Sequence, residues 1–428
     1  MRKLLALSLA LLMLVSIAAC GSGNAEPSPS ASTTPAGTDD PGTKEILYSQ
    51  GATDTEIIIA NSAATSGAYA SVGVPFLAGL EAYLEMVNAE GGIDGRKITF
   101  NHYTDDEFDP AKGKAALAGM VEDEKVFAIV GHFGTPVVGA TVDDLKDYGI
   151  PAVYFVTGIG QLYAEHAATN ADGYNIFPVQ PIYVTEGSIM VAYATGQFEA
   201  KKIGVIYTND DAGMDIYRGA QAQAEKLNGV ELVAEQVTAG AADVSAAVTA
   251  IKNANVDFII IASIQGTMPT IVKELATQSV NKDCITTYVN CSSAMSEAVV
   301  NDIPGKFDVY AMGWVAYDDA DALALYQEWA PADYAMNAYA QTGWIAGHFF
   351  CEGLRRIAGQ DITWENYMNA LESSPIKNPF GGSIDYSNGQ RLGTQEMNLS
   401  KVVSPSDEWP AGWELVFPLS SVDSLLSE

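Results

Sequence analysis

The sequence has few basic residues for its length. Its 22 lysines and arginines stand against 53 aspartates and glutamates, which gives a formal net charge of −31. A chain this acidic is repelled by nucleic acid phosphates and by anionic lipid headgroups. We therefore expect no nucleic acid partner, and we interpret the acidic charge as a solvated surface rather than an active-site signal.

Histidine is also scarce, with only His102, His132, His166 and His348 present. None of the four stands in a recognisable motif with a serine or cysteine nucleophile, and the sequence has no G-x-S-x-G elbow or H-E-x-x-H helix. It also lacks a P-loop and a dinucleotide fingerprint. His132 could serve as a base, yet a core histidine needs no such role. We expect no catalytic residues, no cofactor and no enzyme activity.

Cysteine occurs four times, at Cys20, Cys284, Cys291 and Cys351. Cys20 is the lipid attachment site predicted from the signal peptide described next. The other three cysteines are an odd number, so they can form at most one disulfide. Cys284 and Cys291 flank residues 285–289, a predicted strand that would separate them by on the order of 20 Å, too far to bridge. We predict buried free thiols. Because the sequence has no CxxC pair and no cysteine-histidine cluster, we expect no metal site.

The first residues are typical of a lipoprotein signal peptide. Arg2 and Lys3 precede the apolar run 4–19, which ends in small residues before Cys20. The run is shorter than the roughly 20 residues that cross a bilayer. We expect residues 1–20 to be the signal peptide and Cys20 to be lipidated, so that the protein is extracytoplasmic and anchored to the cell membrane. Residues 21–44, rich in Ser, Pro, Thr, Gly and Ala, should form a flexible tether. We expect no second apolar stretch long enough to span a membrane.

Beyond the tether, short β-branched runs alternate with segments of helical period. The predicted strands are 56–60, 126–130, 152–156, 202–207 and 258–261. The predicted helices are 76–87, 111–121, 138–145, 217–227 and 244–251. Repeated strand-helix units predict an α/β fold of parallel sheets covered by helices on both faces.

The number of strands is too large for one sheet, so we expect two lobes. Pro178 and Pro181 interrupt the pattern and mark a first crossing, and a second crossing is expected within 305–314. A long helix over 334–357 would return to the first lobe. We predict lobe 1 from 45–178 plus about 315–378, and lobe 2 from 179–314 plus about 379–428. Several crossings form a hinge and leave a ligand cleft between the carboxyl ends of both sheets.

Two turns at neighbouring strand ends could hold an anion. In residues 131–136, Thr135 is predicted as a helix N-cap with Pro136 at the first helical position, which leaves backbone N–H groups free for a carboxylate or phosphate. The alternative is that Thr135 simply caps its helix. Residues 156–160 follow the next strand with a hydroxyl, Thr157, and two glycines. Together the turns could cradle one carboxylate, or they are two ordinary turns.

Four segments give the chain a family resemblance. They are residues 62–67 with Gly73, the glycine-rich loop 88–98, the string 103–110 and the segment 381–386. In these segments the chain resembles the type I extracytoplasmic solute-binding proteins, in particular the branched-chain amino acid (Leu/Ile/Val) receptors of ABC transporters. The resemblance covers essentially the whole mature chain. It implies a two-lobed clamshell, a monomer, that delivers a small molecule to a membrane permease with its ATPase subunits.

The resemblance also implies which positions contact the ligand. In the first lobe, carboxylate and amino contacts fall on Thr135, Val156, Thr157 and Gly158, and side-chain contacts fall around Tyr69 and Val72. In the second lobe they fall on Asp211, Ala212, Gln265 and Asn290. At the crossings, Tyr183 and either Trp314 or Tyr317 are the aromatic candidates.

Two positions depart from the family pattern. Relatives that bind α-amino acids often have an acidic residue where this sequence has Asn290, and an aromatic residue at the position of Val72. A buried ammonium without a carboxylate partner is costly. Asp210 or Asp211 could replace the missing acid, or both are solvated surface acids. An α-amino acid, a neutral ligand and a short or aromatic carboxylate therefore all stay open, as does a sensor function for the same clamshell.

Overall fold

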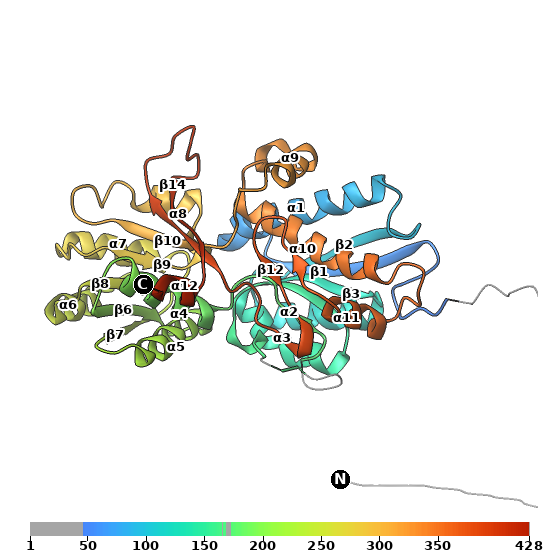
Figure 1. The fold of residues 1–428 in the computed structure, drawn as a ribbon, viewed down its shortest axis with the longest axis horizontal. Coiled ribbons are helices and arrows are strands. Elements are labelled where there is room, and N and C mark those ends of the chain that lie inside the picture. Colours follow the sequence, from blue (N-terminus) through green and yellow to red (C-terminus); the bar gives the residue numbers. More distant parts are fainter. Residues whose placement is uncertain (1–45, 165, 168–172, 428) are drawn as a thin grey trace, which may run out of the picture. The chain divides into compact units, whose positions relative to one another are not determined.

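The computed structural model describes residues 46–164, 166–167 and 173–427. The predicted signal peptide, Cys20 and the tether lie outside these residues. The described chain forms two large sheets and one small one (Figure 1). The first sheet has five strands in the order β2-β1-β3-β4-β5, and the second has seven in the order β14-β13-β10-β9-β8-β6-β7. In the small sheet, β11 (Ile376–Lys377) pairs with β12 (Ser383–Ile384). The α/β prediction with two lobes is confirmed.

Lobe 1 is built on the five-stranded sheet, and all of its strand pairs are parallel. Its strands are β1 (Glu56–Ala63), β2 (Lys97–Asp105), β3 (Ala128–Phe133), β4 (Ala152–Val156) and β5 (Ile176–Phe177). Its helices are α1 (Ala70–Ala89), α2 (Pro110–Ala118), α3 (Thr135–Tyr148), α10 (Ala338–Arg356) and α11 (Trp364–Glu372). Short helical turns η1 (Gly67–Tyr69), η2 (Gly119–Asp123) and η3 (Gly160–Leu162) join them.

Lobe 2 is built on the seven-stranded sheet. Its parallel strands are β6 (Lys202–Thr208), β7 (Glu231–Val237), β8 (Phe258–Ala262), β9 (Cys284–Thr286) and β10 (Val309–Gly313). Its helices are α4 (Tyr183–Gly196), α5 (Asp211–Lys226), α6 (Ser245–Ala254), α7 (Thr267–Thr277), α8 (Ser293–Val299) and α12 (Val422–Leu426). The strands β13 (Met397–Val402) and β14 (Trp413–Ser420) extend the sheet with antiparallel pairs, which the prediction of purely parallel sheets missed.

Two predicted elements have different bounds. The long helix α10 begins at Ala338 rather than at residue 334, because the Asn337 side chain accepts hydrogen bonds from the first N–H groups of the helix. The predicted strand 285–289 is wrong beyond Thr286, since residues 288–290 form the 3-10 turn η4 (Tyr288–Asn290). The three described cysteines are free, as predicted; Cys284 and Cys351 are buried, whereas Cys291 is partly exposed.

The contact between α1 and α10 forms the centre of lobe 1. A Cβ atom added at Gly79 of α1 would lie 1.7 Å from the Ala340 carbonyl oxygen of α10, so the two backbones touch where only glycine fits. The helical segment Gly67–Ala89 is long and apolar enough to cross a membrane, which corrects our expectation that no second such stretch exists. In an apolar 18-residue window of this segment, 67% is buried inside the fold, as in the core helix of a folded domain.

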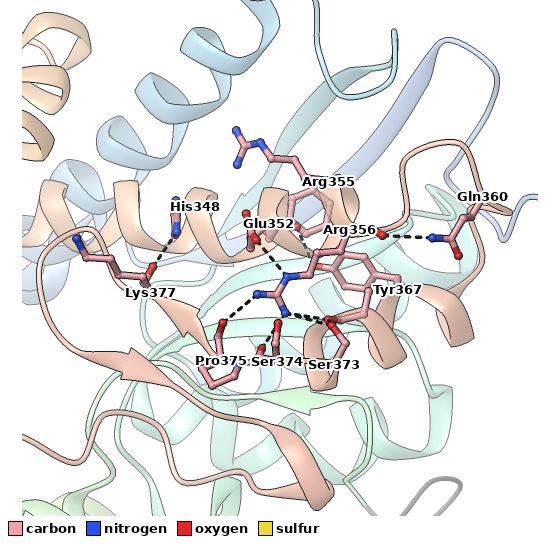
Figure 2. Close-up of polar contacts among 12 residues, drawn as sticks. His348, Glu352, Arg355, Arg356, Gln360, Tyr367, Ser373, Ser374, Pro375 and Lys377 are labelled. Atoms are coloured by element: carbon pink, nitrogen blue, oxygen red, sulfur yellow. Dashed lines mark hydrogen bonds and ion pairs between the residues drawn. The ribbon is translucent and has the colours of Figure 1, made fainter.

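The end of α10 is fastened to α11 and the segment after it. The Arg356 guanidinium donates to the carbonyl groups of Ala370, Ser374 and Pro375 at 2.8–3.0 Å, and Figure 2 shows those of Ser374 and Pro375. The last two lie beyond the C-terminus of α11, where carbonyl groups lack intrahelical donors, so a cation that supplies several N–H groups stabilises them. Earlier in α10, the Nε2 atom of His348 lies 2.9 Å from the carbonyl oxygen of Lys377.

The chain returns to lobe 2 later than residue 379, the predicted boundary. Tyr386 donates from its hydroxyl to the Pro178 carbonyl at 2.8 Å. The fully buried Arg391 lies over the Phe177 ring and forms an ion pair with Glu372 of α11. These contacts hold residues 379–391 against lobe 1, because the buried guanidinium needs its carboxylate partner there. The return follows Arg391 and ends at β13 in the seven-stranded sheet.

Candidate functional site

Two threonine hydroxyls meet at the carboxyl ends of neighbouring strands. Thr135 follows β3 and Thr157 follows β4, and their Oγ1 atoms lie 2.9 Å apart. Both side chains are buried, and the Ile159 N–H donates to Thr157 Oγ1 at 3.2 Å. The parallel sheet therefore brings together the two turns that the sequence suggested as one cradle.

Thr135 does not cap α3, contrary to our prediction. The N-cap is Gly134, whose φ of 90° suits glycine, and no side chain accepts a hydrogen bond from the first turn. Thr135 is the first helical residue and Pro136 the second. At the start of α3, the Val138 N–H donates a hydrogen bond to the Gly134 carbonyl at 2.9 Å. The N-terminus of α3 thus offers main-chain donors and a partial positive charge beside the two hydroxyls.

Tyr183 adds a third hydroxyl from the crossing between the lobes. It is the first residue of α4, and its Oη lies 3.5 Å from Thr135 Oγ1. The Tyr183 N–H donates to the Gly158 carbonyl at 2.6 Å, and a Cβ at Gly158 would lie 2.6 Å from the Pro181 carbonyl oxygen. Burial raises the pKa of Tyr183 to about 12, so its phenol stays a neutral donor at physiological pH. The phenol of Tyr183 and the N-terminus of α3 therefore meet at the two threonine hydroxyls.

A series of aromatic rings, linked by the amide side chain of Gln180, extends from Tyr183 across the crossing between the lobes. The Tyr183 ring stacks on Tyr288 of η4 with centroids 6.0 Å apart. Gln180 joins Tyr288 to lobe 1: its Nε2 donates to the Tyr288 hydroxyl at 2.7 Å, and its Oε1 accepts from the Tyr154 hydroxyl at 3.2 Å. The buried Trp314 ring lies 6.4 Å from that of Tyr154. Trp314 thus reaches the site only through other rings.

Glu186 holds Tyr288 in place, and our reading of the sequence missed it. Its carboxyl group is fully buried and accepts from the Thr287 hydroxyl and the Tyr288 N–H, each at 2.8 Å. Burial raises the pKa of Glu186 to about 8, and the two hydrogen bonds only partly offset this. The one available signal is that Glu186 is an acidic residue in the first turn of α4, a position that is usually a solvated partner of the helix dipole.

The Asn290 side chain is engaged within lobe 2. Its Nδ2 donates to the Ser263 carbonyl and to Thr286 Oγ1, both at 2.8 Å, and its Oδ1 accepts from the Gln265 N–H at 2.6 Å. These bonds join the ends of β8 and β9 and use both atoms of the amide group. Gln265 is partly exposed with a positive φ of 48°. The structure gives Asn290 a structural task at the position predicted for a ligand contact.

The acids predicted near the second lobe have separate environments. Asp210 caps α5, accepting from the Gly213 N–H at 3.0 Å and from the Thr208 hydroxyl at 2.7 Å. Asp211 is exposed and Ala212 is buried beneath it. Asp215, which the sequence did not suggest, accepts from the Gly160 N–H of lobe 1 at 2.6 Å.

Within the part of the chain that the structure describes, Tyr69, Val72 and Tyr317 form no hydrogen bond or ring contact with the three hydroxyl residues. Tyr69 stacks on Phe108 with ring centroids 3.7 Å apart, and Val72 is buried in α1. Tyr317 is exposed and donates to Gln341 Oε1 at 2.6 Å. Val156 directly precedes Thr157, and its carbonyl accepts from the Gly134 N–H at 3.2 Å. Val156 therefore belongs to the hydroxyl cluster by its backbone.

Cavities of about 380 Å³ also lie elsewhere among the described residues, away from the three hydroxyls. One lies in lobe 2 beside Phe307 and Val402, and the other lies beside Asp319 and Lys377. At the predicted site, Thr135 contacts both Thr157 and Tyr183 through its hydroxyl.

The described residues offer little for metal or acid-base chemistry. No group of three or more His, Cys, Asp or Glu side chains within them could hold a metal ion. His132 is fully buried with its Nε2 2.8 Å from Thr141 Oγ1, and burial lowers its pKa to about 4. It is therefore a neutral core histidine at physiological pH.

The sequence matches the family described as "Periplasmic binding protein" over residues 56–407. Over 223 residues it is 26% identical to an amino acid binding protein of Pseudomonas aeruginosa, a match that covers 52% of this chain and 58% of the relative. It is 26% identical over 215 residues to the Leu/Ile/Val-binding protein of Escherichia coli, covering 50% of this chain and 56% of the relative. The chain thus spans little more than half the length of these relatives.

Among solved structures, the fatty acid ABC transporter substrate-binding protein from Thermomonospora curvata has a similar fold. The TM-score is 0.74 at 18% sequence identity, and the superposition covers 90% of this chain and 97% of the other. At this identity the likeness concerns the fold alone.

Proposed function

Because the chain belongs to the periplasmic binding protein family, of type I and related to the Leu/Ile/Val-binding proteins, we propose that it is the substrate-binding lipoprotein of an ABC importer. In this proposal it captures a small carboxylate-containing solute between its lobes and delivers it to the permease and its ATPase subunits. Lipidated Cys20 and the tether 21–44 anchor it, as a monomer, to the outer face of the membrane. It does no chemistry on the solute.

The observation that carries the proposal is the meeting of three hydroxyls beside the N-terminus of α3. Thr135, Thr157 and Tyr183 can each donate to a carboxylate oxygen, and the main-chain donors of α3 add to them. Hydrogen bonds to an ionised acceptor are roughly twice as strong as those between neutral groups. An anionic head group is the solute feature that this arrangement suits best.

The carboxylate, rather than an α-ammonium, is proposed as the main recognised group. In a buried site an ammonium group needs a carboxylate partner. The Asn290 side chain is an amide that is already bonded to the Gln265 N–H, and the Asp210 carboxylate is used as the N-cap of α5. The names of relatives point both ways, since one binds Leu/Ile/Val and a structural neighbour serves fatty acid transport. Branched-chain or other amino acids, and related carboxylates or amides, are therefore candidates, with the plain carboxylates favoured.

Capture follows from differential contacts between open and closed lobes. A solute held by Thr135, Thr157 and Tyr183 meets Tyr288 of lobe 2 only when the lobes close, so binding favours the closed form. The same closure could instead report to a signalling partner, which makes a ligand sensor the second candidate function. Transport of the bound solute by a reconstituted permease would distinguish the two.

A thermal-shift comparison of matched compounds tests the proposal. The mature protein is heated with leucine, 4-methylpentanoate and 4-methylpentanamide, and with the acid and amide forms of octanoate and phenylacetate. A bound compound at 100 times its Kd stabilises by about 2.7 kcal/mol. We expect at least one carboxylate to raise Tm while its amide does not. Equal effects of acid and amide, or no effect of any carboxylate, would contradict the proposal.

The anchor is tested separately. Cys20→Ser in the full chain should move the protein from the membrane fraction to the soluble extracytoplasmic fraction, because the lipid has no other attachment site. Ser22→Cys in the same background serves as a control for position, since a cysteine outside the signal peptide junction should not restore anchoring. Membrane retention of Cys20→Ser would contradict the lipoprotein assignment.

A further inference from the structure

A hydrogen bond between residues other than Thr135, Thr157 and Tyr183 joins the two lobes. The Tyr339 hydroxyl, in the first turn of α10 in lobe 1, donates to the Val289 carbonyl of η4 in lobe 2 at 2.8 Å. Tyr339 lies 50 residues from Val289 along the chain and is only partly buried. The contact therefore has to form between elements that are anchored on different sheets.

The acceptor of this bond is held rigidly by lobe 2. On one side of Val289, the Glu186 carboxyl accepts from the Thr287 hydroxyl and the Tyr288 N–H. On the other side, the Asn290 amide makes three hydrogen bonds to the ends of β8 and β9. A carbonyl fixed on both sides loses little freedom when it accepts a further bond.

The donor is held as firmly by lobe 1. The Asn337 side chain accepts from the N–H groups of Tyr339 and Ala340, at 3.0 and 3.1 Å, and so fixes the start of α10. The next residue, Ala340, touches Gly79 of α1 through its carbonyl oxygen. The Tyr339 ring therefore projects from the best-anchored part of lobe 1.

We propose that Tyr339 is a positioning residue that latches the closed lobes through the Val289 carbonyl without touching the solute. The idea rests on the proposed function in one respect, which is that closure is what captures a solute. The latch acts on the equilibrium between open and closed forms. Its loss should lower the closed-to-open ratio by roughly threefold to tenfold, the effect expected for one net hydrogen bond.

Distance measurements between the lobes test this proposal in the full chain. Nitroxides are attached at Asp143 of α3 and Ala222 of α5 through an encoded ketone residue, which leaves the native thiols untouched. Both positions are exposed, and α3 and α5 belong to different lobes. Pulsed electron resonance then gives the populations of short and long distances with no solute added, so a failed solute screen does not decide the result.

Tyr339→Phe removes only the donor hydroxyl and should shift population from the short to the long distance. Tyr193→Phe is the matched control, because its hydroxyl also donates to a backbone carbonyl, that of Met397 at 2.8 Å, but within lobe 2. The control should leave the populations unchanged. Unchanged populations in Tyr339→Phe, an equal shift in the control, or a parent protein found only at the long distance would overturn the latch.

Discussion

The buried carboxyl of Glu186 makes the stability of the protein depend on pH in a way that a single substitution should remove. Its side chain is fully buried and burial raises its pKa from 4.5 to about 8. In Glu186→Gln the amide oxygen can still accept from the Tyr288 N–H, and the amide nitrogen can donate to the Thr287 hydroxyl. The variant therefore keeps both hydrogen bonds but has no ionisable group at position 186.

The sign follows from proton binding. Since the folded state holds the proton more tightly than the unfolded state, stability is present below the unfolded pKa and is lost as pH rises through the folded pKa of about 8. At pH 9 the ionised carboxyl costs the parent about 4 kcal/mol more than at pH 5, relative to the variant. Glu186→Gln should therefore gain about 4 kcal/mol on the parent between these two pH values.

Urea unfolding followed by tryptophan fluorescence at pH 5, 7 and 9 measures this difference. Carboxyl groups common to both proteins cancel in the comparison, and Glu225→Gln, which removes an exposed acid from α5, provides the control. A difference between Glu186→Gln and the parent that stays constant from pH 5 to 9 would show that Glu186 is not buried as an acid. The link between Glu186 and Tyr288 would then have to be abandoned.

Three further changes have defined outcomes. Thr135→Val should weaken the best carboxylate from the thermal-shift panel by about 1–3 kcal/mol in calorimetry, and an unchanged Kd would remove Thr135 from the site. His132→Asn should reverse part of the acid sensitivity: because burial lowers the His132 pKa to about 4, the parent loses stability as pH falls below 6.5, by about 3 kcal/mol at pH 4 relative to the variant. Denaturation curves with parallel pH dependence would refute this. Arg356→Met should destabilise by about 1–3 kcal/mol because the Ser374 and Pro375 carbonyls after α11 lose their Arg356 donor, whereas Lys114→Met, which breaks an exposed ion pair, should cost about 1 kcal/mol or less. Equal losses in the two variants would contradict the capping role of Arg356.

Sequence periodicity was sufficient to predict the alternation of strands and helices. The strand β4 has the predicted bounds, and the apolar residues predicted on one helix face, from Phe76 to Val87, are buried in α1. Strong local patterns of this kind are set by which face an element buries. The bounds of α10 and of β9 depended instead on single side chains, Asn337 and Thr287, that bond to nearby N–H groups.

Contacts between segments that are distant in the sequence could not be predicted from local sequence patterns. Glu186 is 101 residues from its partner Thr287, and Asn290 bonds groups on two other strands. No local pattern reports such pairs, so the sequence could suggest the hydroxyls at the strand ends but not the buried acid behind Tyr288. The late return of the chain to lobe 2 has the same origin, because it depends on the pairing of Arg391 with Glu372.

The most direct test of solute capture is a crystal structure of the mature protein with the compound that raises Tm most in the panel. We predict its carboxylate within hydrogen-bond distance of the Thr135 and Thr157 hydroxyls, with Tyr183 closing over it. A compound bound elsewhere, or one whose carboxylate points away from both threonines, would contradict the account.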